Sequence, residues 1–142
     1  MIFCDTSFAA KVYVPEAESA SVLRLVEAED EVCASDLMRV ELMGVFHRRL
    51  RERLWSAEDF NAAVRQFSRD HSAGFWSWLP VDGAVVEAAA GCYASLPEAV
   101  FLRSADCVHL FTAIHHGFSA IHTFDRQQAR AAEALGIKPS GI

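Results

Sequence analysis

The sequence lacks an apolar run long enough to cross a membrane. Its longest apolar stretches are interrupted by charged or polar residues well before the roughly 18 residues that a transmembrane helix needs. The N-terminus also lacks the basic segment that precedes the apolar region of a secretory signal peptide. These absences argue against membrane and secreted proteins, and we expect a cytoplasmic protein with no membrane partner.

The signatures of several common sites are missing as well. The four cysteines are scattered, and no pair has the Cys-x-x-Cys spacing of zinc and redox sites, so reduced core cysteines are expected. The six histidines form no His-Glu-x-x-His zinc motif. Neither a glycine-rich phosphate loop nor a Ser-His-Asp order stands out, which argues against nucleotide hydrolases and esterases.

What is present is a globular composition. The chain has 142 residues, of which 52% are hydrophobic and 23% are charged. This is enough apolar material for one domain, residues 1–142, with a sizeable core. The formal net charge of -6 argues against purely electrostatic coating of nucleic acid, although it leaves room for a locally basic surface that binds RNA.

Strand-like and helix-like patterns alternate along the chain. Strands are expected at 1–4, 31–34, 75–79 and 120–123, with an edge strand near Ile137. Helices are expected at 8–14, 18–28, 37–53, from 56 onward, 82–95, 104–116 and 126–135. This order predicts an α/β fold of three layers, in which a central parallel sheet of four to five strands has helices on both faces.

Four carboxylates interrupt stretches whose pattern predicts burial: Asp5, Glu41, Asp106 and Asp125. A buried carboxylate costs several kcal/mol or more unless it is paired, protonated or bound to a metal. Asp5 and Asp125 follow strands and should meet at one sheet edge, while Glu41 and Asp106 share helix faces with apolar residues. Oxygen ligands of this kind select hard cations, so the four together indicate a Mg²⁺ or Mn²⁺ site.

Each carboxylate also has an ordinary structural explanation. Asp5 and Asp125 are well placed to be helix N-caps, and Asp106 to interact with a helix dipole. Glu41 is harder to explain, although an ion pair with Arg39, Arg48 or Arg103 is an alternative to metal binding. The joint occurrence of the four favours the metal site.

Weaker candidates surround these residues. Ser7 and Thr123 are near Asp5 and Asp125 in the sequence and are candidates to hydrogen-bond their carboxylates, although capping or turn hydroxyls are equally common. Arg48, Arg49 and Arg51 are candidates for phosphate contacts, although positive charge is favoured at any helix C-terminus. Two further features are interpreted as packing: His109 within its helix, and the aromatic segment 75–78 in the core.

At these residues the chain resembles PIN-domain nucleases. The resemblance lies in MIFCDTS at residues 1–7, VEL at 40–42, LRSADCVHLFTA at 102–113 and HTFDRQQARAAEALGI at 122–137. The segments match the four acidic motifs of the family in order and approximate spacing, and the chain is most similar to the VapC-type toxins of bacterial toxin–antitoxin pairs. One departure is Phe124, which stands where the family often has a small or polar residue.

The resemblance implies a function and a set of partners. It implies a Mg²⁺- or Mn²⁺-dependent endoribonuclease with Asp5, Glu41, Asp106 and Asp125 as catalytic metal ligands. It also implies a structured RNA substrate such as transfer RNA, a homodimer, and inhibition by a cognate antitoxin. Because no counter-ion for the acidic site is evident, we expect the antitoxin to insert a basic side chain there, with Arg favoured for its planar fork.

Two other functions are open at this point. The chain could be a non-catalytic PIN-like binding module whose acidic pocket receives an arginine from a partner, although the intact acidic positions count against this. It could also be a structure-selective DNA nuclease of the same fold.

Overall fold

The fold is built on five short parallel strands in a computed structural model that describes residues 1–141. The strands are β1 (Ile2–Phe3), β2 (Val32–Ser35), β3 (Trp76–Leu79), β4 (Ala120–His122) and β5 (Lys138–Ser140). Strands β1, β2 and β3 form one hydrogen-bonded sheet and β4 and β5 another, and a parallel bridge between Cys4 and His122 joins them. The strand order is therefore β3-β2-β1-β4-β5, and the predicted parallel sheet is confirmed.

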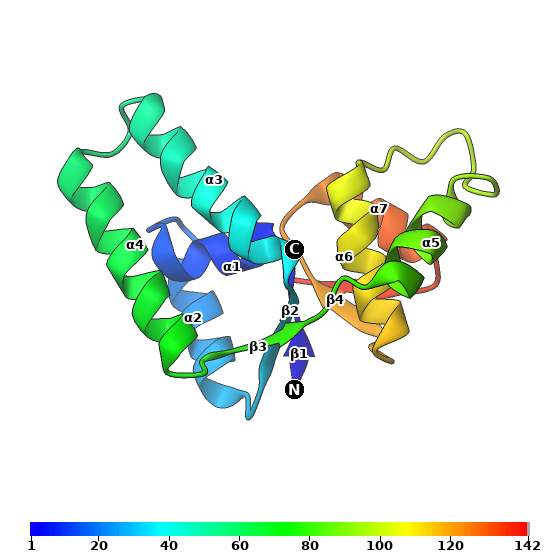
Figure 1. Cartoon of the computed structure of the whole chain (residues 1–142), viewed down its shortest axis with the longest axis horizontal. Helices are drawn as coiled ribbons and strands as arrows, with labels where there is room; N and C mark the ends of the chain where they lie inside the picture. The colour runs from blue at the N-terminus through cyan, green and yellow to red at the C-terminus, as the bar shows by residue number, and fades with distance from the viewer. Residues whose placement is uncertain (142) are drawn as a thin grey trace.

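Seven helices cover this sheet. They are α1 (Thr6–Tyr13), α2 (Ser19–Ala28), α3 (Leu37–Arg51), α4 (Ala57–Ser72), α5 (Gly83–Cys92), α6 (Ser104–His115) and α7 (Arg126–Ala134). Helices α1 to α4 lie on one side of the strands and α5 to α7 on the other (Figure 1). The structure thus has the three predicted α/β/α layers.

The alternation of side chains along the strands creates two separate cores. Ile2 and Cys4 pack into the core formed with α1 to α4, whereas Phe3, between them, packs into the core formed with α5 to α7. Cys33 likewise faces the second core while its neighbours Val32 and Ala34 face the first. Successive residues of a strand point to opposite faces, so a buried strand must be apolar throughout, as these two are.

Local sequence signals explain most of the helix ends. Ser56 and Asp59 form a reciprocal capping box at the start of α4, as their spacing predicts. Gly117 has a φ of 80° directly after the cap of α6, the left-handed conformation that commonly ends a helix. Asp36 occupies the N-cap position of α3, but its side chain makes no capping hydrogen bond and pairs with Arg39 instead.

Two expectations about burial can be compared with the fold. All four cysteines, Cys4, Cys33, Cys92 and Cys107, are free and buried, so their predicted place in the core is confirmed. Trp76 lies in the core, where its indole donates a hydrogen bond to the Tyr13 hydroxyl at 2.8 Å, so the aromatic segment is a packing feature there.

Within residues 1–141, no helix is both long and apolar enough to span a membrane.

Candidate active site

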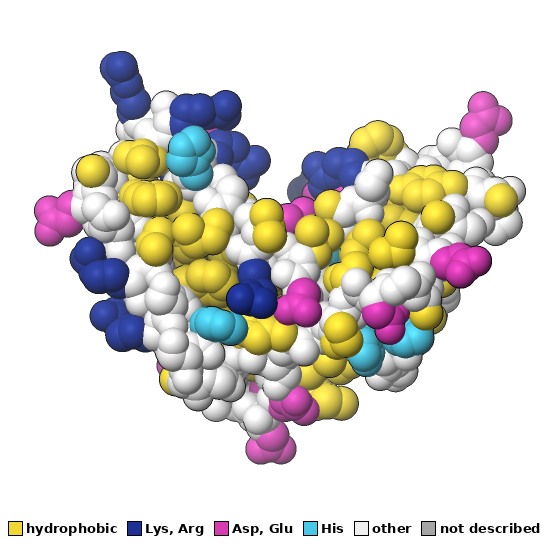
Figure 2. All heavy atoms as spheres, in the orientation of Figure 1, with side chains coloured by type: hydrophobic (Ala, Val, Ile, Leu, Met, Phe, Trp, Pro, Cys, Tyr) yellow, Lys and Arg dark blue, Asp and Glu magenta, His cyan; other side chains and the backbone are white. Residues whose placement is uncertain are grey.

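A cavity of about 710 Å³ opens between α1, α3, α6 and the start of α7. All four predicted carboxylates line it: Asp5, Glu41, Asp106 and Asp125. In the space-filling view the molecule is notched between its two arms, with basic side chains on both upper edges of the notch and acidic ones deeper in it (Figure 2). Strand β1 pairs with β2 on one side and bridges to β4 on the other, so the cavity lies where connections leave in opposite directions, the usual ligand position in such sheets.

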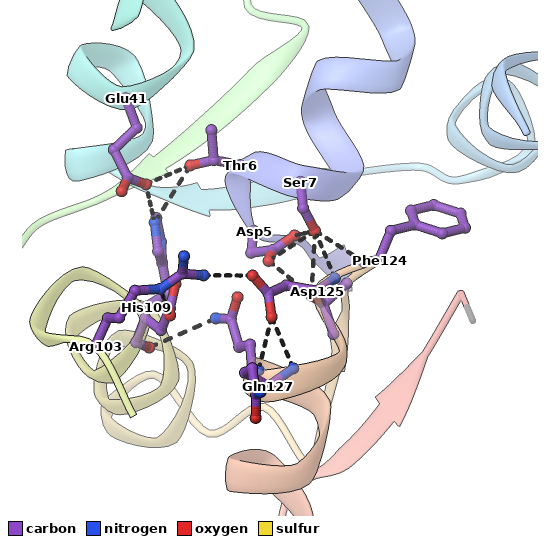
Figure 3. Close-up of polar contacts among 12 residues, drawn as sticks. Asp5, Thr6, Ser7, Glu41, Arg103, His109, Phe124, Asp125 and Gln127 are labelled. Carbon is purple, nitrogen blue, oxygen red and sulfur yellow. Dashed lines mark hydrogen bonds and ion pairs between the residues drawn. The ribbon is translucent and has the colours of Figure 1, made fainter. Parts of the chain in front are cut away.

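Asp5 is the most deeply buried of the four carboxylates, with 2% of its surface exposed. It caps α1 by accepting from the Phe8 amide at 2.9 Å, and it also accepts from the hydroxyls of Thr123 at 2.7 Å and Ser7 at 2.8 and 3.0 Å (Figure 3). Burial raises the pKa of Asp5 to about 6, against the opposing effect of these hydrogen bonds. Both predicted hydroxyls therefore contact Asp5.

Glu41 belongs to a second cluster, on the opposite wall (Figure 3). Its Oε2 atom accepts from the Thr6 hydroxyl at 2.5 Å and from Nε2 of His109 at 2.6 Å. Burial would raise the pKa of Glu41, but the hydrogen bond and charge of His109 and the other donors hold it below its usual value. Glu41 does not face the apolar core as its spacing suggests, because the fully buried face of α3 is formed by Met38, Leu42 and Phe46.

Asp106 and Asp125 share one cation. The guanidinium of Arg103 donates to Asp106 at 2.7 Å and to Asp125 at the other end of its fork (Figure 3). Asp125 also caps α7 through the amides of Gln127 and Gln128. Burial raises the pKa of Asp106 despite Arg103, whereas in Asp125 the backbone hydrogen bonds and Arg103 outweigh burial and lower the pKa.

Several expectations about these carboxylates need correction. The acidic site does have a counter-ion, Arg103, which sequence alone did not reveal. The partner of Glu41 is His109, and not Arg39, Arg48 or Arg103. Asp5 and Asp125 do cap helices, as the structural explanation predicts. This does not argue against a role in the acidic cavity, because one carboxylate can cap a helix and line the cavity at once.

The donor set fits a hard divalent cation in kind. All four candidate ligands are carboxylates, the oxygen ligands that Mg²⁺ and Mn²⁺ prefer. Among the residues described, Glu41 Oε1 and Asp106 Oδ1 accept no hydrogen bond and so keep their lone pairs for a metal. Within residues 1–141, no three acidic, His or Cys side chains are grouped so that they could hold a metal ion in this arrangement. Two of the four carboxylates, Asp106 and Asp125, are paired with Arg103 instead.

Comparison with known proteins identifies the family. Residues 2–134 match the profile of the PIN domain. The chain belongs to the PIN domain family. No curated protein sequence matches the chain.

Among the solved structures that match this chain are two with a similar fold. VapC20 of Mycobacterium tuberculosis, a sarcin-ricin loop cleaving toxin, is 20% identical, with a TM-score of 0.72 over 92% of this chain and 95% of that one. FitAcB from Neisseria gonorrhoeae is 18% identical, with a TM-score of 0.75 over 98% of this chain and 96% of that one. At these identities the likeness shows the fold.

The predicted basic residues of this PIN domain are not equivalent. Arg48 and Arg49 line the cavity from the last turns of α3. Arg51 does not line it, and its exposed side chain contacts the neighbouring Glu52. Two of the three candidate phosphate ligands are thus placed beside the carboxylates, and Arg51 is not.

Other residues of the PIN cavity were missed by sequence reasoning. Thr6 donates to Glu41, and its position next to Asp5 is the only signal that pointed to it. Glu16 contacts both Lys11, at 2.7 Å, and Arg49. The Lys11 ammonium also lies 4.7 Å from the ring centre of Phe124, so the residue that departs from the family pattern supports the rim of the cavity.

Proposed function

We propose that this PIN domain is a Mg²⁺- or Mn²⁺-dependent endoribonuclease that acts as a VapC-type toxin. The observation that carries the proposal is the convergence of four carboxylates, from four separate segments of the chain, on one cavity with arginines at its rim. Family membership supports a nuclease. The similarity to a toxin that cleaves the sarcin-ricin loop supports a structured RNA as substrate.

The four carboxylates are proposed to have different roles in metal binding. Asp5, Glu41 and Asp106 would hold the metal, and Asp125 would act through a water molecule or a second ion. The bound metal supplies an activated water and neutralises charge that develops on the phosphate. Ser7 and Thr123 orient Asp5 by the hydrogen bonds described above.

The substrate requires cationic contacts outside the metal ligands. Arg48 and Arg49 line the same cavity as the carboxylates, so they are the residues that would bind neighbouring phosphates of the RNA. Such contacts fix the register of the backbone relative to the metal. The acidic net charge of the chain makes this local patch more important for binding than the overall electrostatic field.

The toxin assignment brings partners with it. We expect a homodimer in the cytoplasm and an antitoxin that directs a basic side chain, preferably Arg, toward the acidic cavity. Such a side chain must either displace Arg103 from Asp106 and Asp125 or pair with Glu41 and Asp5. Co-purification of an antitoxin that leaves Mn²⁺-dependent cleavage unchanged would contradict this mode of inhibition.

The experiment that tests the function uses purified protein and total cellular RNA. Cleavage should require Mn²⁺ or Mg²⁺, stop with excess EDTA, and be lost in Asp106→Asn. A parallel digestion of DNA separates the RNase from a structure-selective DNA nuclease. Absence of cleavage in every metal, together with binding of an Arg-containing partner, would favour the non-catalytic binding module.

A further inference from the structure

Arg103 occupies an unusual place in the acidic cavity. It is the N-cap residue of α6, where its side chain makes no capping hydrogen bond and instead reaches across to the cap of α7. Its guanidinium contacts Asp106 and Asp125, whose side chains are 13% and 25% exposed, yet its own side chain is 54% exposed. A half-exposed cation thus holds two much less exposed candidate metal ligands.

The contacts of Arg103 are the ones that a divalent cation would make. Asp106, in the first turn of α6, and Asp125, the N-cap residue of α7, are both largely shielded from solvent and meet at Arg103, so a positive charge between these two carboxylates is favourable. A guanidinium meets this need with two arms of one fork. Asp106 keeps one free oxygen, Oδ1, but in Asp125 Oδ1 accepts two backbone amides and Oδ2 accepts from Arg103. A metal that binds both carboxylates must therefore displace the guanidinium at least from Asp125.

Removal of Arg103 requires little rearrangement. Among residues 1–141, its side chain donates only to Asp106 and Asp125, and no other acceptor fixes it. Because the side chain is half exposed, rotation about its own bonds moves it into the cavity without disturbing α6. Arg103 lines the same cavity as Arg48 and Arg49, and its planar fork suits phosphate oxygens as well as carboxylates.

We propose that Arg103 is an exchangeable counter-ion, which competes with the divalent metal for Asp106 and Asp125 and, once displaced, binds a phosphate of the RNA. The proposal rests on the proposed function, because it takes the carboxylates to be metal ligands. It assigns to one side chain two successive partners. Without metal, the guanidinium offsets part of the negative charge of Asp106 and Asp125, and with metal bound the same side chain would be free to bind a phosphate.

The first test measures Mn²⁺ affinity of the full chain without RNA, by isothermal titration calorimetry. Arg103→Gln should bind Mn²⁺ about two- to fivefold more tightly than wild type, the range expected for loss of one exposed competing ion pair. Arg103→Lys keeps the charge but lacks the fork, so its affinity should lie between the two. Arg48→Gln is the matched control, because it removes a charge from the same cavity without contacting a carboxylate, and its effect should be smaller.

The second test measures the rate of cleavage of total cellular RNA at saturating Mn²⁺. Arg103→Gln should cleave about tenfold or more slowly, as expected for loss of a charge-assisted hydrogen bond, although it binds the metal more tightly. These opposite changes identify an exchange between metal and phosphate. A purely structural role would weaken both metal binding and cleavage, and circular dichroism of each variant excludes misfolding as the cause.

Three results would overturn the inference. Weaker Mn²⁺ binding in Arg103→Gln would mean that the arginine organises the carboxylates instead of competing for them. Equal affinity changes in Arg103→Gln and Arg48→Gln would reduce its role to general charge. An unchanged cleavage rate in Arg103→Gln would remove the phosphate contact. In contrast, wild-type protein that binds no Mn²⁺ at all would overturn the proposed function itself.

Discussion

Nε2 of His109 lies 2.6 Å from Oε2 of Glu41, and this contact joins α6 to α3 across the cavity. The other ring nitrogen, Nδ1, lies 2.8 Å from the hydroxyl of Ser35, at the end of β2. Since a carboxylate can only accept, Nε2 donates to Glu41, while Nδ1 pairs with the Ser35 hydroxyl. A buried imidazole, 1% exposed, therefore fixes the direction of a candidate metal ligand.

We predict that His109→Ala weakens both the fold and the metal site. It leaves the Ser35 hydroxyl without its partner in a buried setting, so the free energy of unfolding should fall by about 1–3 kcal/mol. Loss of the contact to Glu41 should also reduce Mn²⁺ affinity by about ten- to a hundredfold, as for other partners of metal ligands. Urea unfolding and calorimetry measure the two effects.

His109→Gln is the control for this prediction. Its amide can replace the Nε2 donor to Glu41, so more Mn²⁺ affinity should survive than in His109→Ala even where stability is lost. Equal metal affinity in wild type and both variants would show that His109 only fills space between α3 and α6.

Asparagine substitutions separate capping from catalysis at Asp5 and Asp125. Asn caps helices about as well as Asp, so Asp5→Asn should keep its helical circular dichroism. It removes the charge that holds the metal, so cleavage should fall by about a hundredfold or more, equivalent to several kcal/mol of lost charge stabilisation. Asp106→Asn and Glu41→Gln should lose cleavage activity to a similar extent. Asp125→Asn should lose less activity, because Asp125 is proposed to act through a water molecule or a second ion.

The order in which the four variants lose cleavage activity is also a test. Cleavage assays give this order, and circular dichroism of the same samples shows whether each variant is folded. If Asp125→Asn were the most damaging of the four, the assignment of Asp125 to an indirect role would be wrong. Loss of helical signal together with activity would make the substituted residue structural.

Much of the fold could be predicted from the sequence, because helices and strands are indicated by patterns of neighbouring residues. The alternation of strand and helix patterns gave the parallel three-layer arrangement, and the pair Ser56 and Asp59 marked the start of α4. Strand ends shifted by one or two residues, since tertiary pairing, and not composition, decides where a strand stops. Asp36 looked like a cap by its position, but its carboxylate pairs with Arg39.

Only part of the candidate site could be predicted from the sequence. Residues that follow strands, such as Asp5, could be placed because the carboxyl ends of parallel strands meet at one edge. The partners of Glu41 and Asp106 could not, because helical spacing tells which residues share a face but not what opposes that face. Arg103 shows this limit most clearly, since a long side chain selects among acceptors that only the folded chain brings within reach.

Glu16 offers a test of the basic rim. Its carboxylate lies between Lys11 and Arg49 and so takes the place of an anionic ligand. Glu16→Gln should free Arg49 for phosphate, whereas Lys11 keeps its ion pair with Glu18. Binding of bulk transfer RNA should tighten and depend more steeply on salt, because one more phosphate is neutralised. Filter binding over a range of salt concentrations measures this. Arg49→Gln should have the opposite effect, and weaker RNA binding in Glu16→Gln would show that Glu16 instead holds the rim in its binding shape.

The raised pKa of Asp5 makes the metal-free fold sensitive to pH. Its folded value of about 6 lies above the ordinary value of 3.8, chiefly because of burial, so the native state binds the proton more tightly than the unfolded state. The contribution of Asp5 to stability is therefore fully present below about pH 4 and is lost as the pH rises through 6. The raised pKa of Asp106 acts in the same direction, while the lowered values of Glu41 and Asp125 act in the opposite one.

We accordingly predict that Asp5→Asn melts higher than wild type in EDTA at neutral pH and gains less from Mn²⁺. The shift at Asp5 corresponds to about 3 kcal/mol at most, and Asn removes it together with the metal-binding charge. Mn²⁺ should raise the wild-type midpoint because it binds the native state preferentially. Thermal melts from pH 4 to 8 test both statements, and the difference between wild type and variant in EDTA should grow with pH. A wild type that melts identically with and without Mn²⁺, alongside a variant that is less stable at every pH, would mean that Asp5 serves as a helix cap and not as a metal ligand.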